Sequence, residues 1–159
     1  MPIGFRNAER EDVPKVLSFI RKLAEYEKLA HEVEATEQML EKYLFGEKRY
    51  AEVIFASLDE EEVGFALFFH NFSTFLGKPG IYLEDLYVLP EYRKRGVGTA
   101  LLRRIARLAK ERGCGRVEWW VLDWNPARKF YESIGAKAMD DWIVYRLKGD
   151  ELAEVAENR

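Results

Sequence analysis

The chain has 159 residues, of which 48% are apolar, 33% charged and 14% aromatic, a composition typical of a single globular domain covering residues 1–159. No apolar run approaches the roughly 20 residues of a membrane span, and residues 1–8 carry no secretory signal, so we expect a cytoplasmic protein without a membrane contact. Cys114 is the only cysteine, which excludes an internal disulfide and a multi-cysteine metal site.

The pattern of apolar residues predicts ten elements in the order β-α-α-β-β-β-α-β-α-β, and therefore a mixed α/β domain. Thr36 is a suitable N-cap for the second helix, which we expect to end at Gly46. A turn at Lys78–Gly80 is expected before the fourth strand. The predicted ranges are 3–7, 8–24, 36–46, 50–58, 63–71, 81–89, 96–112, 116–122, 126–134 and 142–147, followed by a polar tail.

Charge is distributed unevenly along the chain, although the net charge is only −3. Between Glu25 and Glu62 there are twelve acidic and four basic residues, whereas between Arg93 and Arg116 there are nine basic residues and a single acid. Local fields attract ligands of opposite charge, so the first region suits a cation and the second an anion. Two solvated helix faces would give the same pattern. The negative net charge argues against nucleic-acid binding.

The clearest motif is the run Arg93-Lys-Arg-Gly-Val-Gly-Thr99, which joins the strand at 81–89 to the helix at 96–112. Glycines at a helix start let the backbone approach a ligand, and the free N–H groups at the positive helix end bind anions. The motif therefore predicts a pyrophosphate site. A glycine-rich turn that binds nothing is the alternative, because the Gly-Lys-Ser/Thr of a P-loop is absent.

Together with four further runs, this segment resembles the GNAT superfamily of N-acetyltransferases, and within it the diamine, or spermidine/spermine, acetyltransferases. The resemblance implies a mixed, mostly antiparallel sheet flanked by helices, acetyl-CoA as co-substrate, no metal, and a homodimer. The runs that carry it are Leu23-Ala-Glu-Tyr-Glu27, Tyr82-Leu-Glu-Asp-Leu-Tyr-Val88, Trp124-Asn125 and Phe130-Tyr-Glu-Ser-Ile-Gly-Ala136.

By this resemblance, three segments contact the co-substrate. Main-chain groups of Leu86, Tyr87 and Val88 hold the pantetheine arm, and Asn125, Ala127 and Arg128 line the other side. The spacing from Asn125 to Tyr131 is one residue shorter than is usual in the family. The residues implied for the pyrophosphate are Arg93, Lys94, Arg95, Gly96, Val97, Gly98 and Thr99.

An alkylamine with a pKa near 10 must lose a proton before it attacks a thioester at pH 7. Glu84, on the strand beside the expected thioester, is the candidate base, acting through water; a strand-edge salt bridge is its alternative role. Asp85 lies on the opposite face if the strand is regular. By resemblance, Tyr131 is the general acid for the departing thiolate, whereas without the family it reads as a core aromatic.

The resemblance also implies a pocket for a cationic acceptor. Tyr26 and Glu27 match positions that hold the amine, Glu84 and Asp85 add negative charge, and Asp140 with Trp142 approximates a further contact. Carboxylates and aromatic faces together bind cations well.

The acceptor itself stays open between two classes. Ser73-Thr74-Phe75 stands where spermidine-specific members carry an acid, and it is more similar to members that acetylate thialysine or lysine-like amines. The expected reaction is direct transfer in a ternary complex to a polyamine, a diamine or a thialysine/lysine-like amine. An acetyl-CoA-binding regulator without catalysis and an enzyme for peptide amines are the alternatives. His31 and His70 do not form a metal pair.

Overall fold

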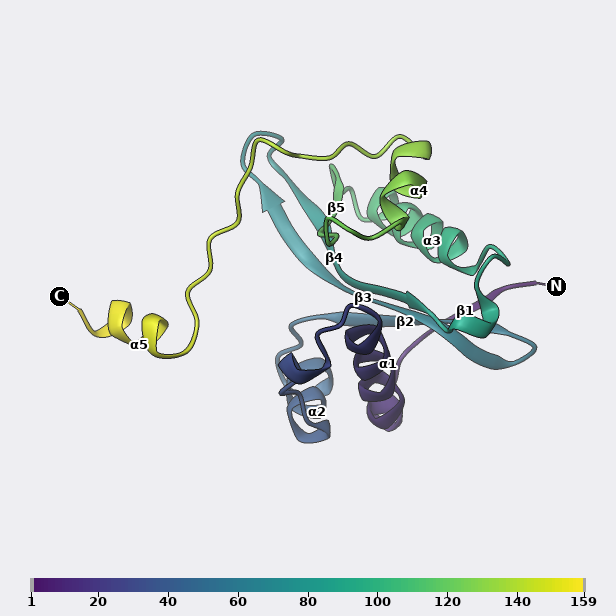
Figure 1. The fold of residues 1–159 in the computed structure, drawn as a ribbon, viewed down its shortest axis with the longest axis horizontal. Coiled ribbons are helices and arrows are strands. Elements are labelled where there is room, and N and C mark those ends of the chain that lie inside the picture. The colour runs from purple at the N-terminus through teal and green to yellow at the C-terminus, as the bar shows by residue number, and fades with distance from the viewer. Residues whose placement is uncertain (1, 159) are drawn as a thin grey trace. The chain divides into compact units, whose positions relative to one another are not determined.

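The computed structural model describes residues 2–158, and the chain divides into two units, Met1–Trp120 and Val121–Arg159. In the first unit, five strands form one sheet in chain order (Figure 1). Strands β1 to β4 are antiparallel, and β5 runs parallel to β4. The strands are β1 (Gly4–Asn7), β2 (Glu52–Leu58), β3 (Glu61–Ser73), β4 (Lys78–Val88) and β5 (Val117–Trp119).

Helices cover both faces of this sheet. Helices α1 (Val13–Tyr26) and α2 (Glu37–Phe45) lie on one face, and α3 (Val97–Glu111) lies on the other (Figure 1). Among residues 2–158, none of the helices has the length and apolar character needed to span a membrane. Short 3₁₀ turns occur at Arg10–Asp12, Ala30–Glu32 and Pro90–Tyr92.

Each face of the sheet has its own apolar packing. On the α1 face, Phe19 stacks on Phe65 with ring centroids 5.1 Å apart, and Tyr87 of β4 belongs to the same buried cluster. On the α3 face, Leu101 lies 3.3 Å from the point where Gly64 would carry a Cβ, so a glycine there lets α3 approach β3 closely. Successive residues of a strand point to opposite faces, so β4 contributes side chains to both layers.

The predicted α/β class and the mostly antiparallel sheet are confirmed, and so are the helices and strands of the first unit to within a few residues. Thr36 Oγ1 accepts a hydrogen bond from the Met39 N–H at 3.2 Å and caps α2 as predicted. The predicted turn at Lys78–Gly80 is wrong, because these residues extend β4. The chain turns earlier, at residues 74–77, where Gly77 takes up a left-handed φ of 67°.

The second unit contains α4 (Ala127–Ser133) and α5 (Gly149–Glu157) with extended chain between them. The predicted final strand at 142–147 is wrong, since none of residues 142–147 is paired in a sheet. Its side chains suit a half-buried pleated surface, but a strand also needs a neighbouring strand to bond with. Trp142 and Tyr145 are 74% and 91% exposed. Strand β5 is also shorter than predicted and ends at Trp119.

Candidate functional site

A β-bulge interrupts β4 in the middle of the predicted site. Leu67 of β3 pairs with Asp85, but the next residue, Phe68, pairs with Leu83, so Glu84 is an extra residue without a partner. Residues that pair across strands point to the same side of a sheet, and Leu67 belongs to the cluster under α1. The bulge therefore turns Asp85 towards the face that α1 covers.

Three carboxyl groups lie near one another beside this bulge. Burial, followed by the charges of Glu84 and Glu27, raises the pKa of Asp85 from 3.8 to about 7. Burial and the charge of Glu84 also raise the pKa of Glu27, the residue that follows α1. The strand is not regular, so the expected separation of Glu84 and Asp85 on opposite faces does not hold. Carboxylates that resist ionisation in one another's presence favour a bound cation or proton.

Aromatic residues continue this face of the sheet towards β5. The Tyr82 ring lies 5.1 Å from Phe69 and edge-on to Trp120 at 5.8 Å, both between ring centroids. Glu118 of β5 stands beside Tyr82 in the parallel register. Burial and then the charge of Glu84 raise the pKa of the Tyr82 hydroxyl. The sequence reading missed Glu118 and Trp120, although the period of two in the predicted strand 116–122 places them on one face.

The edge of β4 that faces β5 is only partly used. β5 pairs with Ile81–Leu83, and none of the described strands pairs with residues 84–88 on that edge. The predicted pantetheine contacts Leu86, Tyr87 and Val88 lie in this segment. Main-chain groups along an unpaired edge can bond to an extended ligand as a strand would.

Helix α3 begins at a glycine-rich loop. Lys94 and Gly96 have left-handed φ values of 65° and 83°, and no side chain caps the helix. A Cβ on Gly98 would meet only Val88, at an ordinary 3.8 Å. Gly98 therefore leaves the backbone without a side chain in the first turn, where the N–H groups of residues 97–99 have no partner within the helix, and the buried Val97 packs that turn against the core.

Arg93 makes different contacts from the rest of the loop. Its Nε donates a hydrogen bond to the Val88 carbonyl at 3.0 Å. Its guanidinium carbon lies 4.7 Å from the centre of the Tyr26 ring and 5.2 Å from that of Tyr87. Tyr26 ends α1 and Tyr87 lies under it, so the guanidinium is on the α1 face of the sheet.

The other predicted co-substrate residues lie in the second unit, around α4. Asn125 Oδ1 accepts a hydrogen bond from the Ala127 N–H at 2.9 Å and so shapes the start of α4. Arg128 Nη1 donates to a main-chain carbonyl of the preceding turn at 3.0 Å. Tyr131 is half-buried in α4, with its ring 5.7 Å from that of Phe130.

Asp140 and Trp142 follow on the extended chain after α4. Both are exposed, and the Trp142 N–H donates to the Met139 carbonyl at 3.2 Å. The predicted site residues are thus divided between the two units.

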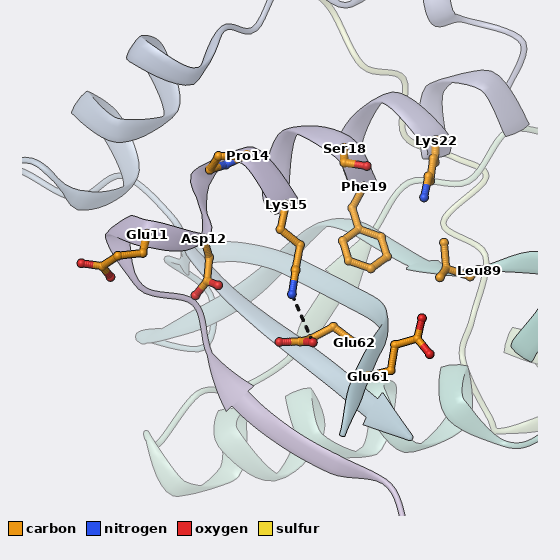
Figure 2. Close-up of a pocket in the computed structure, with 10 residues that line it drawn as sticks. All are labelled: Glu11, Asp12, Pro14, Lys15, Ser18, Phe19, Lys22, Glu61, Glu62 and Leu89. Atoms are coloured by element: carbon orange, nitrogen blue, oxygen red, sulfur yellow. Dashed lines mark ion pairs between the residues drawn. The ribbon is translucent and has the colours of Figure 1, made fainter. Parts of the chain in front are cut away.

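A groove of about 600 Å³ lies between α1 and the start of β3 (Figure 2). Carboxylates outnumber lysines along it, and Lys15 forms an ion pair with Glu62 at 3.1 Å. The groove includes none of the predicted site residues. Among residues 2–158, no three His, Cys, Asp or Glu side chains are grouped to hold a metal ion.

A family model for GNAT acetyltransferases matches residues 17–136, which is well over half of the chain. The chain belongs to the GNAT acetyltransferase family. As a member it is an N-acetyltransferase, and the family takes its acetyl group from acetyl-CoA. The resemblance predicted from the sequence is thereby confirmed.

Relatives of this GNAT enzyme include the thialysine N-epsilon-acetyltransferase of Mus musculus, 36% identical over 163 residues that cover 95% of each chain. The human spermidine/spermine N(1)-acetyltransferase-like protein 1 is 30% identical over 162 residues, 95% of this chain and 23% of that protein. Among solved structures, an integron cassette protein from V. cholerae superposes with a TM-score of 0.82 at 28% identity over 99% of both chains.

The residues of the first unit fit acetyl-CoA by their chemistry. The bare backbone at Gly98, the uncapped start of α3 and the exposed Lys94 and Arg95 suit a diphosphate. The unpaired edge of residues 84–88 suits the amide groups of pantetheine. Both features lie along one strand-to-helix connection.

Proposed function

We propose that this enzyme transfers the acetyl group of acetyl-CoA directly to the primary amine of a small cation, either a thialysine/lysine-like amine or a polyamine or diamine. The observation that carries this proposal is the cluster of Glu27, Glu84 and Asp85 beside the unpaired edge of β4. Three neighbouring carboxyl groups supply charge for a cationic acceptor and a place for its proton.

The residues proposed for the co-substrate follow β4 into α3 and continue in α4. Main-chain groups of Leu86, Tyr87 and Val88 bond to pantetheine, and Lys94 and Arg95 with the backbone of residues 96–99 hold the diphosphate. When bound, acetyl-CoA supplies the acetyl group as a reactive thioester. We also assign Asn125, Ala127 and Arg128 to its other side, by their positions in the family motif.

Glu84 is proposed to accept, through water, the proton that the acceptor ammonium must lose. It is exposed and stands at the bulge, where its charge acts on both Glu27 and Asp85. The freed amine then forms an N–C bond to the acetyl carbon while the C–S bond breaks, and the nitrogen loses a second proton, which replaces the one that Tyr131 gives to the sulfur. An N–H from residues 86–88 donates to the carbonyl oxygen, which gains negative charge, and such a donor is commonly worth about 3 kcal/mol.

Tyr131 is proposed to give its hydroxyl proton to the departing sulfur. A tyrosine pKa near 10 and a thiol pKa near 8.5 differ by about 1.5 units, or roughly 2 kcal/mol, which a local environment can offset. Tyr131 is the second residue of Phe130-Tyr-Glu-Ser-Ile-Gly-Ala136, and it is half-buried on α4. Its place in this motif supports the assignment.

For the acceptor we propose Tyr26 and Glu27 at the end of α1 and Asp85 in β4, with Asp140 and Trp142 as further contacts from the second unit. The similarity to thialysine N-epsilon-acetyltransferases over nearly the whole chain favours a lysine-like amine. The run Ser73-Thr74-Phe75 favours it as well, because it stands where an acid marks the spermidine-specific branch.

We further infer that residues 1–159 act as one domain and that two copies associate in the cytoplasm. The family match supports the single domain, because it runs across the boundary between the two units. The exposed apolar side chains of Trp142, Ile143 and Tyr145 support association, since such surfaces are normally covered. Light scattering of the purified protein tests the dimer.

The deciding experiment measures thiol release from acetyl-CoA with thialysine, lysine, putrescine, spermidine and a peptide N-terminus as acceptors. We expect release with at least one of the small cations, and a kcat about 100-fold lower in Tyr131→Phe. Tyr50→Phe, an exposed tyrosine outside the proposed site, is the matched control. Release with no acceptor would favour a binding module, release with the peptide alone would favour a peptide enzyme, and full activity in Tyr131→Phe would remove that residue from the mechanism.

A further inference from the structure

Arg93 is the first residue of the basic glycine loop, but its side chain is held by other elements. The Nε hydrogen bond to the Val88 carbonyl and the stacking on Tyr26 and Tyr87 fix its guanidinium from three directions. It is half-buried, whereas the next two basic residues, Lys94 and Arg95, are exposed.

The sheet itself separates Arg93 from the start of α3. Tyr87 points to the α1 face, where it joins the cluster around Phe19. Val88, the next residue, points to the α3 face, because its Cγ2 is the atom that a Cβ on Gly98 would meet. A guanidinium that lies over Tyr87 is therefore on the opposite side of β4 from the first turn of α3.

What Arg93 does hold is the end of α1. Tyr26 is the last residue of that helix, and Glu27 and Lys28 follow it, with Lys28 in a left-handed conformation at φ 63°. A positive charge at a helix C-terminus is favourable, because the last carbonyl groups carry partial negative charge. The Tyr26 and Tyr87 rings also meet edge-on at 6.4 Å between centroids, so Arg93 completes a three-membered contact between α1 and β4.

Glu27 is the first residue after this contact, and its carboxyl group lies close enough to Glu84 for that charge to raise its pKa. Like charges repel, so a helix end that was free to move would carry Glu27 away from the bulge. The stacked guanidinium opposes that movement, since planar Arg binds aromatic faces in a fixed orientation.

We propose that Arg93 is a positioning residue for the acceptor amine, which holds Tyr26 and Glu27 against the β4 bulge, and not a ligand of the diphosphate. The proposal rests on the function proposed above. It divides the basic loop into two parts: Arg93 serves the acceptor side of β4, and residues 94–99 serve the co-substrate.

The test compares Arg93→Ala and Arg93→Lys with Arg95→Ala, and uses Arg21→Ala, an exposed arginine of α1, as the surface control. For each variant the KM of the acceptor is measured at saturating acetyl-CoA, and the Kd of coenzyme A by calorimetry. We expect Arg93→Ala to raise the acceptor KM about tenfold and to leave the coenzyme A Kd within about twofold. Arg95→Ala should raise the coenzyme A Kd about tenfold and leave the acceptor KM within about twofold. Arg93→Lys should lie between the parent protein and Arg93→Ala, because lysine keeps the charge at the helix end but loses the Nε hydrogen bond to the Val88 carbonyl.

A readout without turnover keeps the inference separate from the proposed function. Hydrogen exchange of residues 23–29 should be faster in Arg93→Ala than in the parent protein and in Arg95→Ala. Unchanged exchange there, or weaker binding of coenzyme A by Arg93→Ala, would each overturn the positioning role. Absence of any acetyl transfer by the parent protein would refute the proposed function, and the exchange of residues 23–29 would still decide whether Arg93 holds α1.

Discussion

The glycine loop and the carboxylate cluster adjoin the same strand, β4, but they are built in different ways. The loop is contiguous, with Lys94, Arg95 and Gly96 exposed and left-handed conformations at Lys94 and Gly96. The cluster takes Glu27 from the end of α1, and Glu84 and Asp85 from β4. An anion site of backbone N–H groups forms wherever a helix starts without a cap, whereas a cation site must bring like charges together at a cost in stability.

The largest effect should follow from Glu84→Gln, which removes the proposed base from the cluster without changing the size of the side chain. At pH 7 we expect kcat/KM to fall about 100-fold, because nearly all of the amine is protonated and must lose its proton on the enzyme. The deficit should shrink as the pH rises towards the pKa of the amine, near 10. Steady-state rates from pH 7 to 9.5 measure both effects.

Glu47→Gln, an exposed glutamate at the end of α2, controls for the loss of one surface charge. A deficit in Glu84→Gln that stays constant across the pH range would contradict a role in proton transfer. It would leave Glu84 as a binding group for the cation.

A smaller effect is expected in the glycine loop, from Gly98→Ala. A Cβ at this position meets only Val88, at 3.8 Å, and Gly98 has no left-handed φ, so the free protein should accept alanine and even gain helix stability. If a diphosphate lies against this backbone, the new methyl group should weaken coenzyme A binding about tenfold. Calorimetry gives the Kd, and thermal melting confirms the fold.

The control is Ala106→Gly in the exposed middle of α3. This substitution should lower the melting temperature and leave the coenzyme A Kd unchanged. A coenzyme A Kd that is the same in Gly98→Ala and in the parent protein would mean that no ligand approaches the start of α3.

The sequence predicts the glycine loop well. The run from Arg93 to Thr99 carries its own turn and helix start, so local chemistry is enough to place it, and the Thr36 cap was read in the same way. The residues of the carboxylate cluster could be predicted only from the family resemblance. Its geometry depends on the extra residue at Glu84, and nothing local distinguishes a bulge from a regular strand in the run 82–88.

Two other features were not predicted correctly from the sequence, for a similar reason. The final strand was predicted from β-rich composition at 142–147, but pairing is decided by a partner that composition does not name. The contacts of Arg93 were missed because a motif assigns a residue type to a ligand, whereas Tyr26, 67 positions earlier in the chain, decides where that guanidinium lies.

The smallest effect, and the one that tests the cost of the cluster, should follow from Asp85→Asn. The pKa of Asp85 is raised to about 7 in the folded protein, chiefly by burial, from 3.8. An acid whose pKa is raised by folding binds more protons in the native state than in the unfolded state. Its contribution to stability is therefore full below about pH 4 and is lost as the pH rises towards 7. Asparagine cannot ionise and removes this loss.

We therefore expect Asp85→Asn to be more stable than the parent protein at pH 8 by about 1 kcal/mol. This is below the roughly 4 kcal/mol that the full shift represents at 1.36 kcal/mol per unit, because solvent screens a half-buried group. The advantage should vanish near pH 4, and acceptor turnover should fall, since a charge for the amine is gone. Urea unfolding at pH 4, 6 and 8 measures the difference, with the exposed Asp141→Asn as control. An equal effect at all three pH values would mean that Asp85 ionises as freely as a surface carboxylate, and that the cluster costs the fold nothing.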